Sequence, residues 1–207
     1  MISGSSASLR RGFGALLIAA FGACLAPSAV AQTAAAAQWG VETLMQNLAR
    51  VKIARATFVE RKYLSMLNAP LEFSGTLVYT APGRLEKYTL LPKPESLVLE
   101  HDKLTMENKG RNQRRTLVLQ DYPVIWAFVE SIRSTLAGDL QTLNRFYRAS
   151  LEGGEDQWRL LLKPTEPKMQ SMVSEIRIGG SKNRIRTIEI VETEGNRSVM
   201  TITEDEL

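Results

Sequence analysis

The sequence contains few of the side chains that catalysis and metal binding require. Its 207 residues include one cysteine, Cys24, and one histidine, His101. An intrachain disulfide needs two cysteines and a structural zinc site needs about four Cys or His ligands, so the sequence excludes both. His101 precedes Asp102 in a predicted turn, where a solvated surface residue is expected rather than a general base.

Other catalytic signatures are absent as well. The sequence has no Gly-x-Ser-x-Gly elbow and no phosphate-binding glycine loop. Acidic pairs occur at residues 155–156 and 205–206, in a predicted turn and near the terminus, where solvated charge is the usual explanation. The sequence therefore predicts that the protein is not an enzyme and has no metal site and no cofactor.

The N-terminal residues have the organisation of a secretory signal peptide. Arg10 and Arg11 precede an apolar run over residues 13–26, and Ala29 and Ala31 place small side chains where a signal peptidase reads them. We therefore expect a signal peptide over residues 1–31 with cleavage after Ala31. The mature chain, residues 32–207, is expected to form a single domain in an oxidising compartment to which it is exported.

Three alternatives remain for this segment. An uncleaved anchor is disfavoured because the apolar run is shorter than the ~20 residues that a bilayer requires. A lipoprotein signal would acylate Cys24, although the aromatic Phe21 stands where a branched aliphatic residue is expected. The arginine pair also resembles a twin-arginine signal, but nothing in the sequence indicates a cofactor that must be loaded before export.

The charge of the chain does not indicate a nucleic-acid partner. Removal of residues 1–31 takes away two arginines and no acids, which lowers the formal net charge from +4 to +2. The densest basic cluster, Lys109, Arg111, Arg114 and Arg115, lacks the interleaved aromatic residues on which bases stack. We expect a solvated hairpin tip, and the functional alternative is a docking patch for anionic headgroups or an acidic partner.

The stretch over residues 73–98 shows the pattern from which the fold is inferred. Phe73, Leu77 and Tyr79 fall on one face of a strand of period two, and polar side chains alternate with them. Pro82 and Gly83 turn the chain into a second alternating run, and a third follows after two prolines. Adjacent antiparallel strands with one apolar face require a cover.

The same patterns predict eleven strands and about three helices. The expected strands cover residues 54–63, 71–79, 84–91, 96–101, 103–108, 113–119, 147–152, 157–163, 172–179, 184–192 and 197–204, and the glycine pair Gly179-Gly180 is one of the expected turns. Most strands follow one another directly, which favours an antiparallel sheet. So long a sheet must curl. The fold class is therefore mainly β with α, an incomplete 11-stranded antiparallel barrel, or half-barrel, with a helical lid.

The helices supply the lid. They are expected over residues 41–51, 123–136 and 139–146, and the second carries an apolar stripe. Asp121 is its expected N-cap, Pro123 suits its first turn, and Gly138 suits its left-handed end. Asp139 is expected to cap the third helix. Two of these helices form a hairpin inserted between strands.

A set of apolar side chains faces the expected space between sheet and lid. It comprises Phe58, Phe73, Leu77, Leu85, Leu97, Leu99, Phe128, Ile132 and Leu136. Such a set either lines a cavity or collapses into a dry core, and a dry core is the usual outcome. The residues alone leave both possibilities open.

Several segments together resemble the periplasmic lipoprotein carrier family LolA. The amphipathic helix is followed by A-T-F-V-E, then by G-T-L-V-Y-T-A-P-G-R-L-E-K-Y, and then by P-E-S-L-V with a turn and a strand after it. The resemblance covers residues 41–202 and is strongest between Phe58 and Leu104. It implies the LolA/LolB-like half-barrel with a helical lid over a hydrophobic cavity. The nine apolar residues would then line a pocket for acyl chains.

The resemblance also implies a function and partners. It indicates a periplasmic carrier that takes acylated lipid or lipoprotein from an inner-membrane transporter donor to an outer-membrane acceptor. We expect a monomer. One alternative is a LolA-like sensory or regulatory lipid-binding domain, as in stress-response regulators that bind anti-sigma factors and add a second, C-terminal domain. Another is an accessory protein of a lipid or aryl-polyene biosynthesis and export system.

One position departs from the family pattern. The family's lipoprotein carrier has an arginine just before the proline of the first turn, which holds the lid shut and helps to transfer cargo, and Ala81 stands there in this sequence. Arg84 and Arg133 are the candidate substitutes at the lid and mouth, and the alternative for each is an ordinary surface arginine. The run S-I-R-S-T-L-A-G-D-L, residues 131–140, is similar to divergent LolA-like proteins found with lipid or aryl-polyene systems. Acylated lipid is therefore a broader expectation for the cargo than lipoprotein alone.

Overall fold

The computed structural model describes residues 39–204, and all of them belong to the unit Ala36–Leu207. The expected signal peptide and Cys24 lie outside the described residues. Among the helices of residues 39–204, none is long and apolar enough to cross a membrane.

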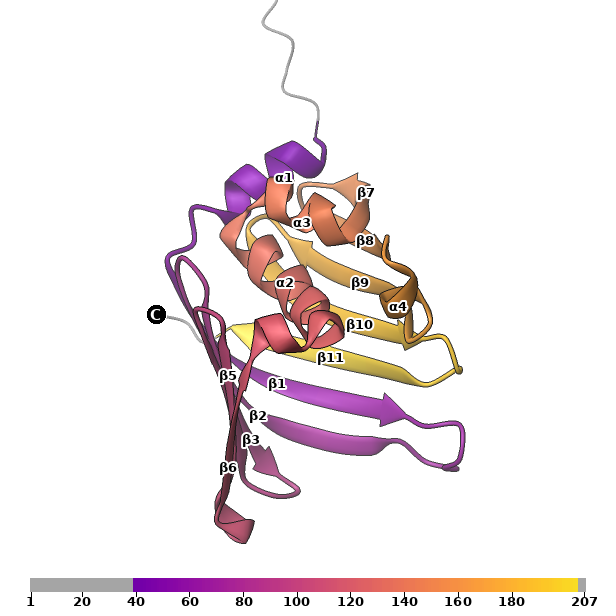
Figure 1. Cartoon of the computed structure of the whole chain (residues 1–207). Coiled ribbons are helices and arrows are strands. Elements are labelled where there is room, and N and C mark those ends of the chain that lie inside the picture. The colour runs from indigo at the N-terminus through magenta and orange to yellow at the C-terminus, as the bar shows by residue number, and fades with distance from the viewer. Residues whose placement is uncertain (1–38, 205–207) are drawn as a thin grey trace, which may run out of the picture. The chain divides into compact units, whose positions relative to one another are not determined.

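Within these residues, eleven strands form one antiparallel sheet in the order β6-β5-β4-β3-β2-β1-β11-β10-β9-β8-β7 (Figure 1). They are β1 (Ile53–Tyr63), β2 (Leu71–Thr80), β3 (Arg84–Leu91), β4 (Glu95–Glu100), β5 (Lys103–Asn108), β6 (Gln113–Val118), β7 (Tyr147–Gly154), β8 (Gln157–Pro164), β9 (Val173–Ser181), β10 (Arg184–Glu192) and β11 (Arg197–Glu204). Sheet neighbours are consecutive strands of the chain except at the centre, where β1 pairs with β11 and places Phe58 opposite Ile202. Because β6 and β7 are edges, the sheet stays open, and the predicted incomplete 11-stranded half-barrel is confirmed.

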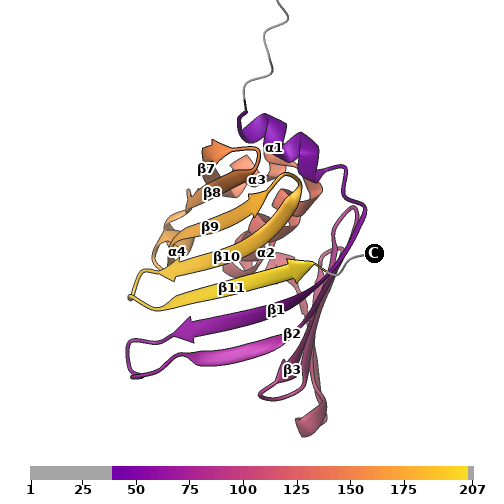
Figure 2. The same cartoon turned by 180° about the vertical axis from the view of Figure 1, so that it is seen from behind.

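Helices cover one face of this sheet. They are α1 (Val41–Leu48), α2 (Pro123–Ala137), α3 (Leu140–Phe146) and the short α4 (Pro167–Gln170), with 3-10 turns η1 (Lys109–Arg111) and η2 (Leu119–Asp121). Figure 1 shows α2 and α3 lying across the concave face, and Figure 2 shows the strands from behind with these helices on the far side. α1 ends three residues before the predicted end, and the short α4 has no counterpart among the predicted elements.

The start of α2 differs from the expectation. Pro123 occupies the first turn, as predicted, because its missing N–H would have no partner there in any case. The N-cap, however, is Tyr122, and no side chain caps the helix. Asp121 closes η2 instead, so its prediction as the cap is wrong.

The junction between α2 and α3 follows the sequence pattern. Gly138 ends α2 in the left-handed conformation with φ 68°, which costs glycine little. Asp139 Oδ1 accepts a hydrogen bond from the backbone N of Thr142 at 2.9 Å and so caps α3. Hydrogen bonds from the side chain and the backbone of Thr142 lower the pKa of Asp139, which keeps the cap ionised.

Gly179 and Gly180 do not form the predicted turn. Both lie inside β9, and the chain turns at Lys182, whose φ is 53°. A Cβ at Gly180 would lie 2.4 Å from Cζ2 of the buried Trp158. The glycine therefore serves the close approach of the indole to the strand, which is the other common reason for glycine in a strand.

The core divides into two clusters. The larger one packs β8–β10 against α1 and α3 and includes Leu160, Ile176, Leu44 and Leu143. The smaller one joins β4–β6 to α2 and consists of Leu99, Leu104, Leu117, Leu119 and Val129. α2 is thus held by packing at both sides of the half-barrel.

Candidate functional site

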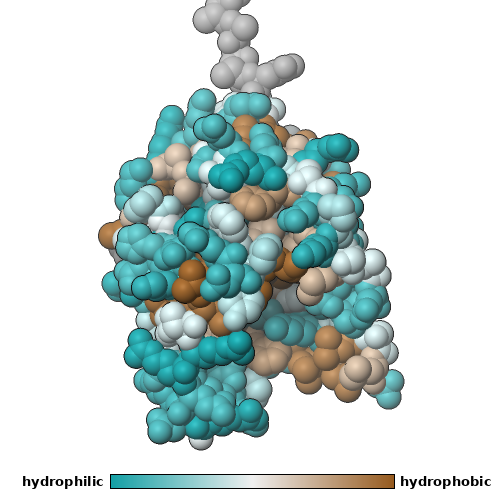
Figure 3. All heavy atoms as spheres, in the orientation of Figure 1, coloured by the Kyte–Doolittle hydropathy of each residue, from teal (hydrophilic) through white to brown (hydrophobic). Residues whose placement is uncertain are grey.

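A cavity of about 650 Å³ lies between α2 and the concave face of the sheet. Its lining draws on both core clusters, with Ala56 and Ile202 from one and Leu99 and Leu117 from the other. Figure 3 shows the molecule hollowed below the helices, with apolar side chains beside the hollow. Pockets that bury small ligands span roughly 300–1,000 Å³, so this volume is that of a ligand site.

α2 forms the roof of the cavity. Its lining residues recur at i, i+3, i+4, i+7 and i+11: Ile125, Phe128, Val129, Ile132 and Leu136. This spacing places them on one side of a helix, which is the stripe that the sequence predicted. The stripe faces the sheet without filling the space beneath it.

The sequence-derived apolar residues occupy three different places. Seven of the nine line the cavity: Leu77, Leu85, Leu97, Leu99, Phe128, Ile132 and Leu136. Phe73 lines a second hollow beside it. Phe58 lines neither hollow; the residue is 2% exposed, and Lys87 Nζ lies 4.8 Å from its ring centroid. Phe58 therefore belongs to the packed core and not to the cavity wall.

Arg84 does not reach the cavity. Successive strand residues point to opposite faces, and Leu85 lines the cavity, so Arg84 points to the other face of β3. Its Nε donates to Glu86 at 2.8 Å, and its Nη1 donates to Glu100 at 2.5 Å. The expectation of a place for Arg84 at the mouth is not met.

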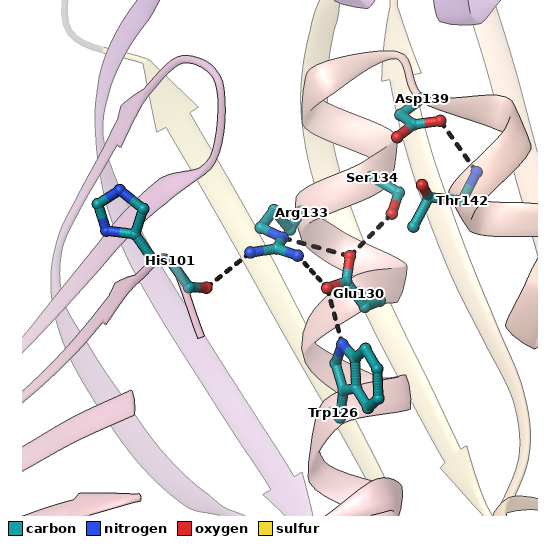
Figure 4. A network of polar contacts seen from close by, with 7 residues as sticks. All are labelled: His101, Trp126, Glu130, Arg133, Ser134, Asp139 and Thr142. Carbon is teal, nitrogen blue, oxygen red and sulfur yellow. Dashed lines mark hydrogen bonds and ion pairs between the residues drawn. The ribbon is translucent and has the colours of Figure 1, made fainter. Parts of the chain in front are cut away.

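Arg133 lies where α2 meets the sheet (Figure 4). Its Nη1 donates to the carbonyl of His101 at 2.7 Å, in the β4–β5 turn, where His101 has a φ of 55°. The β2–β3 turn is close as well, since a Cβ added at Gly83 would lie 2.8 Å from Cδ of Arg133. This is the turn that carries Ala81. Arg133 of the lid helix thus contacts the β2–β3 turn, which is the turn where the family resemblance implies an arginine in place of Ala81.

The partner of Arg133 within α2 is the buried carboxylate of Glu130, which is 2% exposed. Arg133 Nε donates to Glu130 Oε2 at 3.2 Å, and Nη2 forms a short ion pair with Oε1. Trp126 Nε1 donates to Oε1 at 3.0 Å, and Ser134 Oγ donates to Oε2 at 3.2 Å. A buried charge is tolerated when it is paired and hydrogen-bonded in this way, so the network fixes the direction of Arg133.

Sequence reasoning missed the charged residues of the cavity wall, among which Glu60, Lys62 and Lys87 lie close together. Glu60 is 5% exposed and accepts hydrogen bonds from Lys87 Nζ at 2.5 Å and Ser198 Oγ at 2.7 Å, while Lys62 Nζ lies 3.6 Å away. Burial alone would raise the pKa of Glu60, but the charge and hydrogen bond of Lys87, with Ser198 and Lys62, lower it below its ordinary value. Glu60 therefore stays ionised inside a largely apolar site.

The alternation of side chains along the strands could have identified these charged residues from the sequence. Glu60 and Lys62 follow Phe58 at steps of two along β1, and Lys87 follows Leu85 in the same way along β3. Residues at such steps share a face of the sheet. Charged residues on a predicted inner face are therefore candidates for the site.

The hydroxyl of Tyr79 is a buried polar atom without a hydrogen-bond partner in the part of the chain that the structure describes. Tyr79 lines the cavity, and its hydroxyl is buried and has no hydrogen bond within residues 39–204. Burial raises the pKa of Tyr79, so the hydroxyl stays protonated and can donate. Leaving such a group unsatisfied costs about 1–3 kcal/mol.

In the part of the chain that the structure describes, no group of three or more His, Cys, Asp or Glu side chains is placed to hold a metal ion. The arrangement can shelter an apolar ligand from water and offer it ionic contacts at one end.

An open antiparallel half-barrel with a helical lid over an apolar cavity defines the class of LolA-like half-barrel proteins. The chain belongs to the family described as outer membrane lipoprotein carrier protein LolA-like, whose model matches residues 31–203. The members of this family are lipid- and lipoprotein-binding or carrier proteins of the bacterial envelope.

Solved structures similar to this chain have low sequence identity to it. A LolA superfamily protein from Nitrosomonas europaea is 9% identical, with 81% of this chain and 94% of that chain covered and a TM-score of 0.41. A putative outer membrane lipoprotein-sorting protein domain from Vibrio parahaemolyticus is 10% identical, with coverages of 79% and 90% and a TM-score of 0.44. A chain of the Pseudomonas aeruginosa MucA/MucB complex is 14% identical, with coverages of 79% and 55% and a TM-score of 0.45.

A comparison with curated proteins finds no match. The chain is accordingly a divergent member of its family, and the similarities do not identify its cargo.

Proposed function

We propose that this protein is a non-enzymatic periplasmic carrier that holds the acyl chains of a lipid or lipoprotein under α2. In this role it takes the cargo from an inner-membrane donor to an outer-membrane acceptor. The observation that carries the proposal is the cavity of about 650 Å³ with aliphatic and aromatic walls. Membership in the LolA-like family supports it.

The energetics of acyl burial fit this role. Each methylene moved from water into an apolar site contributes ~0.8 kcal/mol. About ten buried methylenes would contribute about 8 kcal/mol before the entropic cost of association is subtracted. No covalent step is needed to retain the lipid during transit.

Release requires a lid that opens at modest cost. A closed state favoured by only a few kcal/mol can be displaced by an acceptor with differential affinity for the open state. Within residues 39–204, one hydrogen bond, from Arg133 to His101, links α2 to the β4–β5 turn, which is compatible with such opening.

The first test asks what the protein carries. Protein purified from the periplasm would be analysed by native mass spectrometry and by lipid extraction. We expect a co-purifying acylated molecule. Purified protein without any bound lipid, and without affinity for an acyl probe, would contradict the proposal.

The second test asks where the chain binds. Leu77→Glu places a charge in the cavity wall, whereas Val59→Glu makes the same kind of change on the opposite face of the neighbouring strand, where Val59 is 39% exposed. Because a buried unpaired charge is costly, Leu77→Glu should weaken binding of a fluorescent fatty acid about tenfold or more. Val59→Glu should leave it unchanged. Equal affinities in two folded variants would place the acyl site elsewhere.

The third test separates transport from sensing. A carrier accelerates the movement of a labelled lipid from donor vesicles to acceptor vesicles in proportion to its concentration. A sensory domain would bind the lipid without accelerating its transfer.

A further inference from the structure

The concave face of β2–β6 changes polarity along its strands. One row of cross-strand partners next to the lid is apolar apart from one hydroxyl: Tyr79, Leu85, Leu99, Leu104 and Leu117. Because side chains alternate, the next row on the same face is found two residues further along each strand. The apolar row is the part of the wall where acyl chains are expected.

The next row is mixed. Leu77 is followed across the sheet by Lys87, Leu97, Met106 and Arg115. The row after that is polar, with Thr89, Glu95, Asn108 and Gln113 on β3–β6. The wall therefore runs from apolar under the lid to charged and polar at the far ends of β3–β6.

A second hollow, of about 870 Å³, occupies this polar end. It shares five lining residues with the apolar cavity: Glu60, Lys62, Lys87, Leu97 and Met106. The two hollows therefore adjoin. A molecule with apolar chains in the first would have its other end in the second.

Two lysines of this second hollow are held beside aromatic rings, and Arg115 is free to bind an anion. Lys87 Nζ lies 4.8 Å from the ring centroid of Phe58, and Lys62 Nζ lies 5.1 Å from that of Phe73. Such cation–π contacts hold the ammonium groups at the edge of the apolar wall. Arg115 makes no ion pair within residues 39–204, so its guanidinium is available for a bidentate contact.

Two of the three acids that line the hollow make contacts with neighbouring side chains, and Glu107 is the third. Glu60 accepts hydrogen bonds from Lys87 and Ser198, which leaves Lys62 as the second and weaker ion-pair partner at 3.6 Å. Glu95, in the polar row, accepts from Asn108 Nδ2 at 2.8 Å. The lining of this hollow has four lysines and arginines against three glutamates, so a formal charge of +1 remains.

We propose that the second hollow is a subsite for an anionic headgroup, a phosphate or carboxylate, of a lipid whose acyl chains occupy the apolar cavity. Lys62, Lys87 and Arg115 bind the anion, and Glu60 holds Lys87 in position. This inference rests on the proposed carrier function and adds the chemical class of its cargo. It also divides the basic cluster of the sequence, because Arg114 and Arg115 line the hollow and Lys109 and Arg111 do not.

The test compares two lipids that differ only in the headgroup. Dioctanoyl phosphatidic acid and dioctanoylglycerol have identical chains, and each would displace a bound hydrophobic dye from the purified protein. Hydrogen bonds to charged groups make a tenfold or larger preference for the phosphatidic acid the expected result. Inorganic phosphate alone should not displace the dye.

Single variants assign this preference to the subsite. Lys62→Gln and Arg115→Gln should each reduce the preference severalfold. Because Arg115 does not line the apolar cavity, Arg115→Gln should leave dioctanoylglycerol binding unchanged. Arg111→Gln makes the same charge change at the tip of the same hairpin, outside both hollows, and should have no effect.

The outcomes are distinguishable. Equal binding of both lipids, with the variants unchanged, overturns the headgroup subsite but leaves the carrier function intact. Failure of both lipids to displace the dye counts against the carrier function itself. Binding of inorganic phosphate as tight as that of phosphatidic acid shows a site for free anions, and the assignment to a lipid headgroup is then wrong.

Discussion

The two sides of the half-barrel cover their concave faces differently. On β8 and β9, the inward side chains of Leu160, Leu162, Ile176 and Ile178 are completely buried, and none of them lines the cavity. On β2–β4, Leu77, Leu85 and Leu97 are only half-buried, and all three line it. Apolar residues alternate in the same way on both sides, but the helices cover the two sides differently.

The difference follows from how the helices are distributed. α1 and α3 both contact β7, and their buried residues join the larger cluster over β8–β10. On the other side, α2 alone crosses above β2–β4, and its stripe does not reach the floor. The β8–β10 side is thus fully packed without a ligand, whereas the β2–β4 side has apolar surface that a ligand can cover.

The largest effect that would test this contrast is on stability. Leu160→Ala should reduce the free energy of unfolding by about 2–5 kcal/mol, because it opens a hole in a filled core. Leu97→Ala should cost less than about 1 kcal/mol, since its side chain already borders a cavity. Urea denaturation measures both values. Similar losses at the two positions would mean that the β2–β4 side is as densely packed as the β8–β9 side.

An intermediate effect on stability is expected at Arg133, which links the lid helix α2 to the sheet. Arg133→Met leaves the buried carboxylate of Glu130 without its charged partner and removes the bond to His101. The free energy of unfolding should fall by about 1–3 kcal/mol, and a hydrophobic dye should enter the cavity severalfold faster in stopped-flow mixing.

Two controls accompany this prediction. Arg177→Met removes an arginine that pairs with Glu175 and Glu189 on the filled side and is 40% exposed, so it should cost no more than about 1 kcal/mol and leave dye entry unchanged. Adding Glu130→Gln to Arg133→Met should restore stability but not the slow entry. Unaltered entry rates in both arginine variants would show that Arg133 does not restrain the lid.

The smallest effect concerns the charged group in the wall of the open side. The pKa of Glu60 is lower in the folded protein than its ordinary value of 4.5, so folding favours the ionised carboxylate. This contribution is complete above that ordinary value and is lost as the pH falls through the lowered folded pKa. Between neutral pH and pH 3 to 4, the wild type should therefore lose more stability than Glu60→Gln, as measured by urea midpoints. Asp139, whose pKa is also lowered, is common to both proteins and cancels in the comparison. Parallel pH profiles would show that Glu60 contributes nothing pH-dependent to folding.

Local features of the chain were readable from the sequence. The sequence itself determined the eleven strands, the apolar stripe of α2 and the left-handed end at Gly138, since each depends on residues close together in the chain. The same alternation also identified Leu77, Leu85 and Leu97 as inward-facing. Where a residue had two possible local explanations, the prediction from sequence was wrong. Gly180 was predicted to form a turn, but it allows the close approach of Trp158.

Only the tertiary structure decided which inward faces are filled and which are open. Strand periodicity gives the face of a side chain but not the distance to the helix above it, so it could not separate the buried Phe58 from Leu77 in the cavity wall. The ion pair of Glu60 with Lys87 depends on how three strands lie side by side, and the contact of Arg133 with His101 depends on where α2 crosses the sheet. Each of these joins residues more than 25 positions apart in the chain, which local pattern does not encode.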